Sequence, residues 1–191
     1  MLINFKNARC KLLEQKKTTL QQAISLMESQ MQEFYNHAVW ICDNEILAEN
    51  AIEATFREIK KNVKALSQAE YLKCGLYKIL KSQCELQKTY ADSSHLSFKK
   101  PKYDQSEQFI ANRKALRSLK CYYSEPLIMQ IIGGFTISEI ASYSGVSKLL
   151  TLDRLSIARE QLLMLAGQGG SSSPISSIAF SQETPKNAII N

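Results

Sequence analysis

Hydrophobic residues recur at helical spacing over most of the chain. The five apolar side chains from Ile52 to Leu66 follow one another at steps of four and three residues, which places them on one face of a helix of about twenty residues. Similar stripes run from Met31 to Ile41 and from Leu72 to Leu86, and a less regular one leads in over residues 6–27. The pattern predicts an all-α protein whose first helical domain spans residues 1–88, leading helix included.

This pattern is interrupted between residues 89 and 105. The interval is polar and contains Pro101, which disfavours helical backbone in the residue before it, so we interpret 89–105 as a flexible linker. Helical spacing resumes over residues 106–166, and the Gly- and Ser-rich end at 167–191 is typical of a disordered tail. The sequence therefore predicts two small helical domains joined by a flexible linker.

The second domain contains the order helix, turn, helix. Thr136 and Glu139 form a capping-box pattern that opens a short helix, Gly145 supplies a turn, and Ser147 is a candidate N-cap for the long helix that follows. The small Ala141 inside the short helix lets the two helices approach closely. Such a unit places its second helix in the DNA major groove, although an ordinary helical hairpin shows the same pattern.

Charge is distributed unevenly along the chain. The net charge of the whole protein is +6, yet residues 28–53 carry six acidic side chains and no Lys or Arg. Residues 57–102 carry eleven basic side chains against four acidic ones, a net charge of +7. An acidic surface followed by a basic one indicates two partners, one basic and one anionic, unless both are merely solvated helix faces.

Other classes of protein are disfavoured by the same sequence. No apolar run approaches the roughly 20 residues that span a bilayer, and Lys6 interrupts the segment where a secretory leader would be apolar. Five scattered cysteines without a Cys-x-x-Cys pair fit reduced thiols, so we expect a cytoplasmic protein. The lack of nucleophile, phosphate-loop and zinc motifs predicts no enzyme activity, no cofactor and no metal site.

Several segments resemble one protein family. Residues 134–147, which read GFTISEIASYSGVS, and the later residues 158–160 are similar to the promoter −35-binding region (region 4) of sigma-70 family RNA polymerase sigma factors. Residues 48–56 and then 76–82 look like region 2 of the same family. Only these two regions are present, in the family's order and with a linker between them, as in the small extracytoplasmic-function (ECF) group.

This resemblance implies a transcription initiation factor that joins core RNA polymerase and directs it to promoter DNA, with an anti-sigma factor as a common further partner. The polymerase-docking positions of the family correspond to Glu49, Asn50 and Glu53, within the acidic stretch. The −10 DNA-binding side corresponds to Lys60, Lys61, Lys64, Lys73, Tyr77, Lys78 and Lys81. Tyr71 or Tyr77 could stack on an unpaired base, or both could be aromatic residues that pack between helices. The helix–turn–helix contacts correspond to Ser147, Lys148, Thr151, Arg154 and Arg159.

Departures from the family pattern leave two other functions open. Lys60 and Gly75 stand where the family has Trp, and the recognition helix begins with Leu149, Leu150 and Leu152 in place of polar and basic residues. Leucine can touch a thymine methyl group but cannot satisfy the polar edge of a base. The alternatives are a helix–turn–helix regulator that does not use the polymerase, and a helical adaptor whose leucines dock on a protein.

Overall fold

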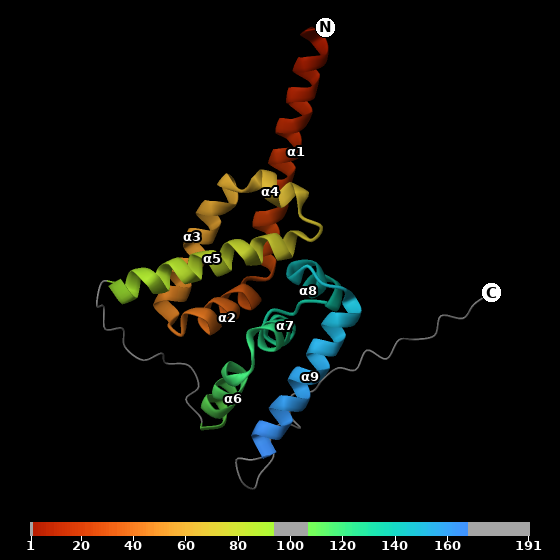
Figure 1. Cartoon of the computed structure of the whole chain (residues 1–191). Helices are drawn as coiled ribbons and strands as arrows, with labels where there is room; N and C mark the ends of the chain where they lie inside the picture. The colour runs from red at the N-terminus through yellow and green to blue at the C-terminus, as the bar shows by residue number, and fades with distance from the viewer. Residues whose placement is uncertain (1, 94–106, 168–191) are drawn as a thin grey trace, which may run out of the picture.

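The computed structural model describes residues 2–93 and 107–167, and within them every regular element is an α-helix. The elements are α1 (Leu2–Ser29), α2 (Met31–Cys42), α3 (Glu45–Lys61), α4 (Val63–Gln68), α5 (Leu72–Ser93), α6 (Glu107–Ser118), α7 (Cys121–Ile131), α8 (Ile137–Ser144) and α9 (Lys148–Gly167). The all-α prediction is therefore confirmed (Figure 1). The predicted linker from residue 94 on and the predicted tail from residue 168 on lie outside the described residues; residues 89–93 continue α5.

Helices α1–α5 form the first helical unit, with α5 packed against α2 and α3 (Figure 1). Its centre is made of apolar side chains that include Phe34, Ala48, Ile59, Leu76 and Leu80, all buried. Figure 1 shows that the N-terminal half of α1 projects away from the other helices. Among the side chains of α1 that the structure describes, the buried ones lie in its second half.

The stripe from Ile52 to Leu66 belongs to two helices, which corrects the single helix expected from its spacing. α3 ends at Lys61 and α4 begins at Val63, so Asn62 separates them. The Asn62 side-chain amide donates to the carbonyl oxygen of Glu58 at 2.9 Å. Asn side chains compete with the main chain for such acceptors, which is why they favour helix ends over helix interiors.

Helices α6–α9 form the second unit, around a small cluster of Leu119, Leu127, Leu155 and Ala158. The capping box predicted at the start of α8 is present. The Thr136 hydroxyl accepts from the backbone N–H of Glu139 at 3.3 Å, and the Glu139 carboxylate accepts from the N–H of Thr136 at 2.8 Å, completing the capping box.

The turn between α8 and α9 is made by Gly145, whose φ of 66° is left-handed and favours glycine. The Ser147 hydroxyl accepts from the backbone N–H of Leu150 at 3.2 Å and so caps α9, as its sequence position predicted. These local contacts fix the crossing of α8 and α9.

The two units share one buried core. Met129, Phe135 and Ile140 of the second unit belong to the same buried cluster as the centre of the first. α8 packs on α5, and Figure 1 shows α7 and α8 beside α2 and the start of α5. The two helical units predicted from the sequence are thus packed together in this structure, and their contact covers part of the surface that the sequence assigned to DNA.

Candidate nucleic-acid interface

The acidic surface lies on α3 and is open to solvent. Glu49, Asn50 and Glu53 are all exposed, and the two carboxylates are one helical turn apart. Glu53 accepts from Arg57 at 2.6 Å, an exposed pair of the kind that contributes little to stability. Partial burial, followed by the charges of Glu45 and Glu49, raises the pKa of the neighbouring Tyr35, as expected where negative charge accumulates.

A first group of basic side chains is equally accessible. Lys60 and Lys61 end α3, and Lys64 lies in α4; all three are exposed. Lys61 donates to Glu58 at 2.6 Å, a partly exposed pair of the kind that contributes little to stability. These three lysines form a surface that an anion can reach in the arrangement described.

Lys73, by contrast, is covered by the loop between α7 and α8. Its Nζ donates to the carbonyl oxygen of Gly134 at 3.1 Å and lies 4.5 Å from the centre of the Phe135 ring. The side chain is buried, and burial lowers its pKa. Lys73 therefore has no access to DNA in this arrangement.

Lys81 is engaged by α7. It forms an ion pair with Glu125, whose carboxylate also accepts from the Tyr143 hydroxyl at 3.1 Å. Burial lowers the pKa of Lys81, but the hydrogen bond with Glu125 and the negative charge around it outweigh that effect and hold the pKa above its ordinary value. Lys78 is exposed, with its Nζ 5.4 Å from the centre of the Tyr143 ring.

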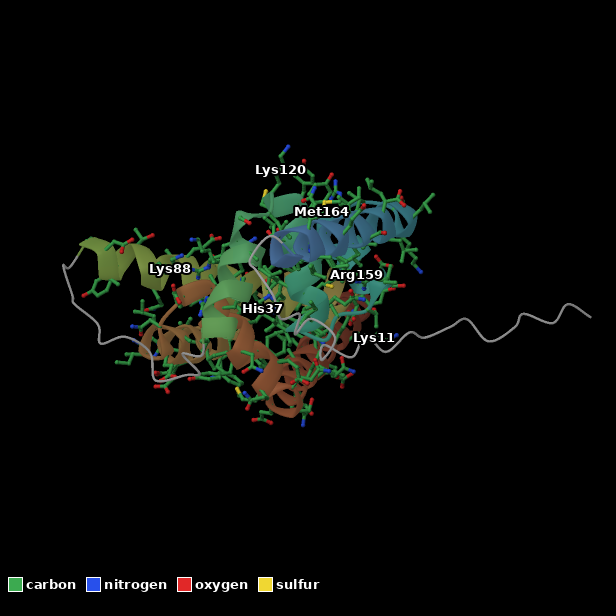
Figure 2. The ribbon with its side chains drawn as sticks, turned by 90° about the horizontal axis from the view of Figure 1, so that it is seen from below. Lys11, His37, Lys88, Lys120, Arg159 and Met164 are labelled. Atoms are coloured by element: carbon green, nitrogen blue, oxygen red, sulfur yellow. The ribbon has the colours of Figure 1, made fainter. Side chains whose placement is uncertain are left out.

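Tyr77 is inside the shared core and cannot stack on a base here, which corrects one expectation for this residue. Its hydroxyl is 2.6 Å from Nε2 of His37, and its ring meets those of Phe135 and Tyr143 edge-on at 5.3 and 5.2 Å. His37 is itself buried (Figure 2). Its burial, aided by the charges of Lys73 and Lys81, lowers the pKa of His37 to about 3, so the ring is neutral.

Tyr71 is more accessible than Tyr77. It is half-buried and lines an open cavity of about 530 Å³ between α4, α5 and the end of α8. Lys78, Glu58 and Glu70 contribute charged groups to the same walls. An aromatic ring beside a basic side chain can hold an unpaired base by stacking and by charge.

The first turns of α9 present a mixed surface. Lys148 is exposed, Ser147 is used as the cap, and the Arg154 guanidinium lies 5.9 Å from the centre of the Tyr122 ring. Between them are the exposed side chains of Leu149, Leu150 and Leu152.

Two of the predicted contacts on α9 face inward. Thr151 is 1% exposed and donates to the carbonyl oxygen of Ser147 at 3.0 Å. Arg159 donates to the Gln130 side chain on α7 at 2.7 Å. Because both stand on the packed side of the helix, Thr151 and Arg159 are not DNA contacts in this arrangement, which corrects the expectation for them.

Sequence reasoning missed the side chains that hold the second unit to the first. Arg113 and Arg117 of α6 both reach Asp43, at 2.8 and 3.0 Å, and both lie over the Trp40 ring. Glu125 supplies the pair with Lys81. The i, i+4 spacing of the two arginines was a visible signal, but nothing local to them indicates Asp43, which lies 74 residues before Arg117.

No group of three His, Cys, Asp or Glu side chains that could hold a metal ion occurs within residues 2–93 and 107–167. In the same residues no helix combines the length and the apolar character that a bilayer span requires.

Comparison with known proteins relates the chain to a solved structure. No family model and no curated protein matches the sequence. Among solved structures, the chain is similar to one described as the sigma factor RpoE in complex with the anti-sigma factor NepR from Bartonella quintana. The TM-score is 0.48 and the sequence identity 19%, over 86% of this chain and 99% of that one.

Proposed function

We propose that this protein is a sigma-type transcription initiation factor, which joins core RNA polymerase and directs it to promoter DNA. One observation carries the proposal. The positions at which the sequence resembles the polymerase-docking helix, Glu49, Asn50 and Glu53, are exposed together on one helix. A compact acidic surface suits a basic partner because complementary charge speeds and orients the encounter.

DNA binding is assigned to two separate surfaces. In the first unit, Lys60, Lys61 and Lys64 supply contacts to phosphates, and the cavity beside Tyr71 accepts an unpaired base. In the second unit, α8, the Gly145 turn and α9 act as a helix–turn–helix, with Lys148 and Arg154 toward the duplex. The protein itself supplies no catalytic group in this proposal, and an anti-sigma partner stays a prediction.

The test is binding of the full chain to purified core polymerase. Replacing both acidic residues, Glu49→Lys and Glu53→Lys, is expected to weaken the complex by at least about tenfold, because four units of charge change on the docking surface. The readout is the dissociation constant measured with labelled chain. A matched double variant, Glu85→Lys with Glu160→Lys, makes the same charge change at exposed residues of α5 and α9 and should bind as the parent does. Equal affinities for both variants would contradict the proposal.

The exposed leucines of α9 favour one alternative, the helical adaptor. Leu149 is 70% exposed at the start of the helix that a DNA reader would place in the groove. A sigma-type factor should lose promoter-directed transcription on Lys148→Ala with Arg154→Ala, by about tenfold if each removes one phosphate or base contact. An adaptor should tolerate that pair and lose its function on Leu149→Asp. Transcription from a mixed promoter library with core polymerase distinguishes the two.

A further inference from the structure

Two cysteines from distant parts of the chain meet in the buried core. Cys42 is the last residue of α2 and Cys84 lies in α5, and both belong to the same cluster of buried side chains. The sulfur of Cys42 lies 4.0 Å from the carbonyl oxygen of Cys84, and the two thiols are hydrogen-bonded to each other. Neither residue belongs to the surfaces proposed for polymerase or DNA. The pair is therefore a cluster of reactive groups to which the proposed function gives no role.

The two thiols differ in acidity. The hydrogen bond with Cys84 lowers the pKa of Cys42, and together with the positive charge of Lys88 it outweighs the opposing effect of burial. The same hydrogen bond, followed by burial, raises the pKa of Cys84. The thiolate rather than the thiol is the nucleophile in cysteine chemistry. Cys42 is thus the member of the pair suited to attack, and Cys84 is the member that keeps its proton.

Access to solvent separates the two thiols in the same sense. Cys42 is 5% exposed at the end of α2, next to the exposed Asp43, whereas Cys84 is completely covered. Only the attacking sulfur has to meet an oxidant, and hydrogen peroxide is little larger than a water molecule. Cys74 lies elsewhere on α5 and donates to the carbonyl oxygen of Glu139 at 3.2 Å. Burial, aided by the charge of Glu139, raises the pKa of Cys74 to about 11, so its thiol stays protonated.

We propose that Cys42 and Cys84 form a redox site, at which hydrogen peroxide converts the two thiols into a disulfide that joins α2 to α5. The Cys42 thiolate attacks one oxygen of the peroxide, the O–O bond breaks, and the leaving oxygen takes up a proton as water, which leaves Cys42 as a sulfenic acid. The sulfur of Cys84 then attacks the Cys42 sulfur and the S–O bond breaks. The departing hydroxide takes the Cys84 proton and forms a second water. Two electrons have passed from the thiol pair to one peroxide, and a dithiol reductant reverses the change.

The test is reaction of the full chain with hydrogen peroxide. Cys121 is exposed and can react on its own, so the measurement is made on Cys121→Ser, which keeps four of the five cysteines. One disulfide consumes two thiols, so the four thiols titrated in the unfolded chain should fall to two, and dithiothreitol should restore them. After the remaining thiols are blocked with N-ethylmaleimide, mass spectrometry of the digested chain should find the peptide of Cys42 joined to the peptide of Cys84.

Further variants in the same background separate the roles of the two cysteines. In Cys84→Ala the oxidation should stop at the sulfenic acid of Cys42, which dimedone traps as a covalent adduct. In Cys42→Ala the Cys84 thiol should remain unreacted, because it is covered and its pKa is raised. Cys74→Ala also truncates a buried cysteine of α5 and is the matched control, in which the disulfide should still form. Circular dichroism verifies that each variant is folded.

The charge of Lys88 gives a test that leaves both thiols in place. Lys88→Gln should slow disulfide formation at neutral pH by about twofold, because the Cys42 thiolate loses a favourable positive charge. Lys64→Gln removes the same charge from an exposed residue of α4 and should react at the parent rate. The readout is the rate at which thiols disappear.

Three results would overturn the proposed redox site. The first is recovery of Cys42 and Cys84 as blocked thiols at a peroxide exposure that oxidises Cys121 in the parent chain. The second is a disulfide that joins other cysteines in place of this pair, and the third is an unchanged loss of thiols in Cys42→Ala. The assays contain neither polymerase nor DNA, so failure of the redox site and failure of the proposed function are separate results.

Discussion

Phe135→Ala is expected to lower the free energy of unfolding by about 3 kcal/mol, among the larger effects available to a single substitution in this chain. The ring belongs to the second unit and is buried against side chains of the first. It meets Tyr77 edge-on at 5.3 Å and His37 at 6.3 Å, and the Lys73 ammonium lies over its face. Truncation leaves a cavity in the shared core and removes the aromatic and cation–π contacts together. Urea unfolding followed by circular dichroism measures the change.

The matched control is Leu149→Ala, which truncates a large apolar side chain that is 70% exposed. Its effect on the unfolding free energy should stay within about 0.5 kcal/mol, because little buried surface is lost. A loss at Phe135 no larger than the loss at Leu149 would show that the ring does not join the two units in solution.

Acidification is expected to destabilise the folded chain through His37. The pKa of this residue is about 3 in the folded state, chiefly because burial disfavours its charged form, against an ordinary value of 6.5. The folded state therefore binds fewer protons than the unfolded state, and stability falls as the pH drops below 6.5 toward 3. Between about pH 7.5 and about pH 5 the loss from this one group is about 2 kcal/mol.

The measurement is urea unfolding of the parent chain at about pH 7.5 and at about pH 5. The control that isolates His37 is the same pair of measurements on His37→Gln. This variant is less stable at every pH because it disturbs the bond to the Tyr77 hydroxyl, but its stability should change little between the two pH values. His95 is present in both proteins, so its titration cancels. An equally steep pH dependence in the variant would assign the effect to other groups.

Local structure was the part of this fold that the sequence predicted well. The capping box at Thr136, the turn at Gly145 and the cap at Ser147 depend on residues within a few positions of one another, so pattern alone identifies them. The same reasoning failed at Asn62, where the hydrophobic stripe continues although the helix does not. Periodicity records which side chains face the core, and two successive helices can share one face.

The candidate site shows the same difference between features that depend on neighbouring residues and features that depend on distant contacts. Exposure of Glu49, Asn50 and Glu53 followed from their places on the polar side of α3. The burial of Thr151 and Tyr77, and the pairing of Lys81, depend on contacts that the local pattern does not record. A basic residue in a charge pattern has the same appearance whether its partner is a nucleic acid or a carboxylate 44 residues later, as with Lys81 and Glu125.

The projecting half of α1 determines where the chain is most susceptible to proteolysis. From Leu13 to Thr18 every side chain is exposed, on all sides of the helix, and the first buried side chain that follows is Thr19. Backbone held by helical hydrogen bonds alone opens locally at small cost in free energy. Proteases that cut after lysine should therefore reach Lys16 and Lys17 while the packed helices behind them stay intact.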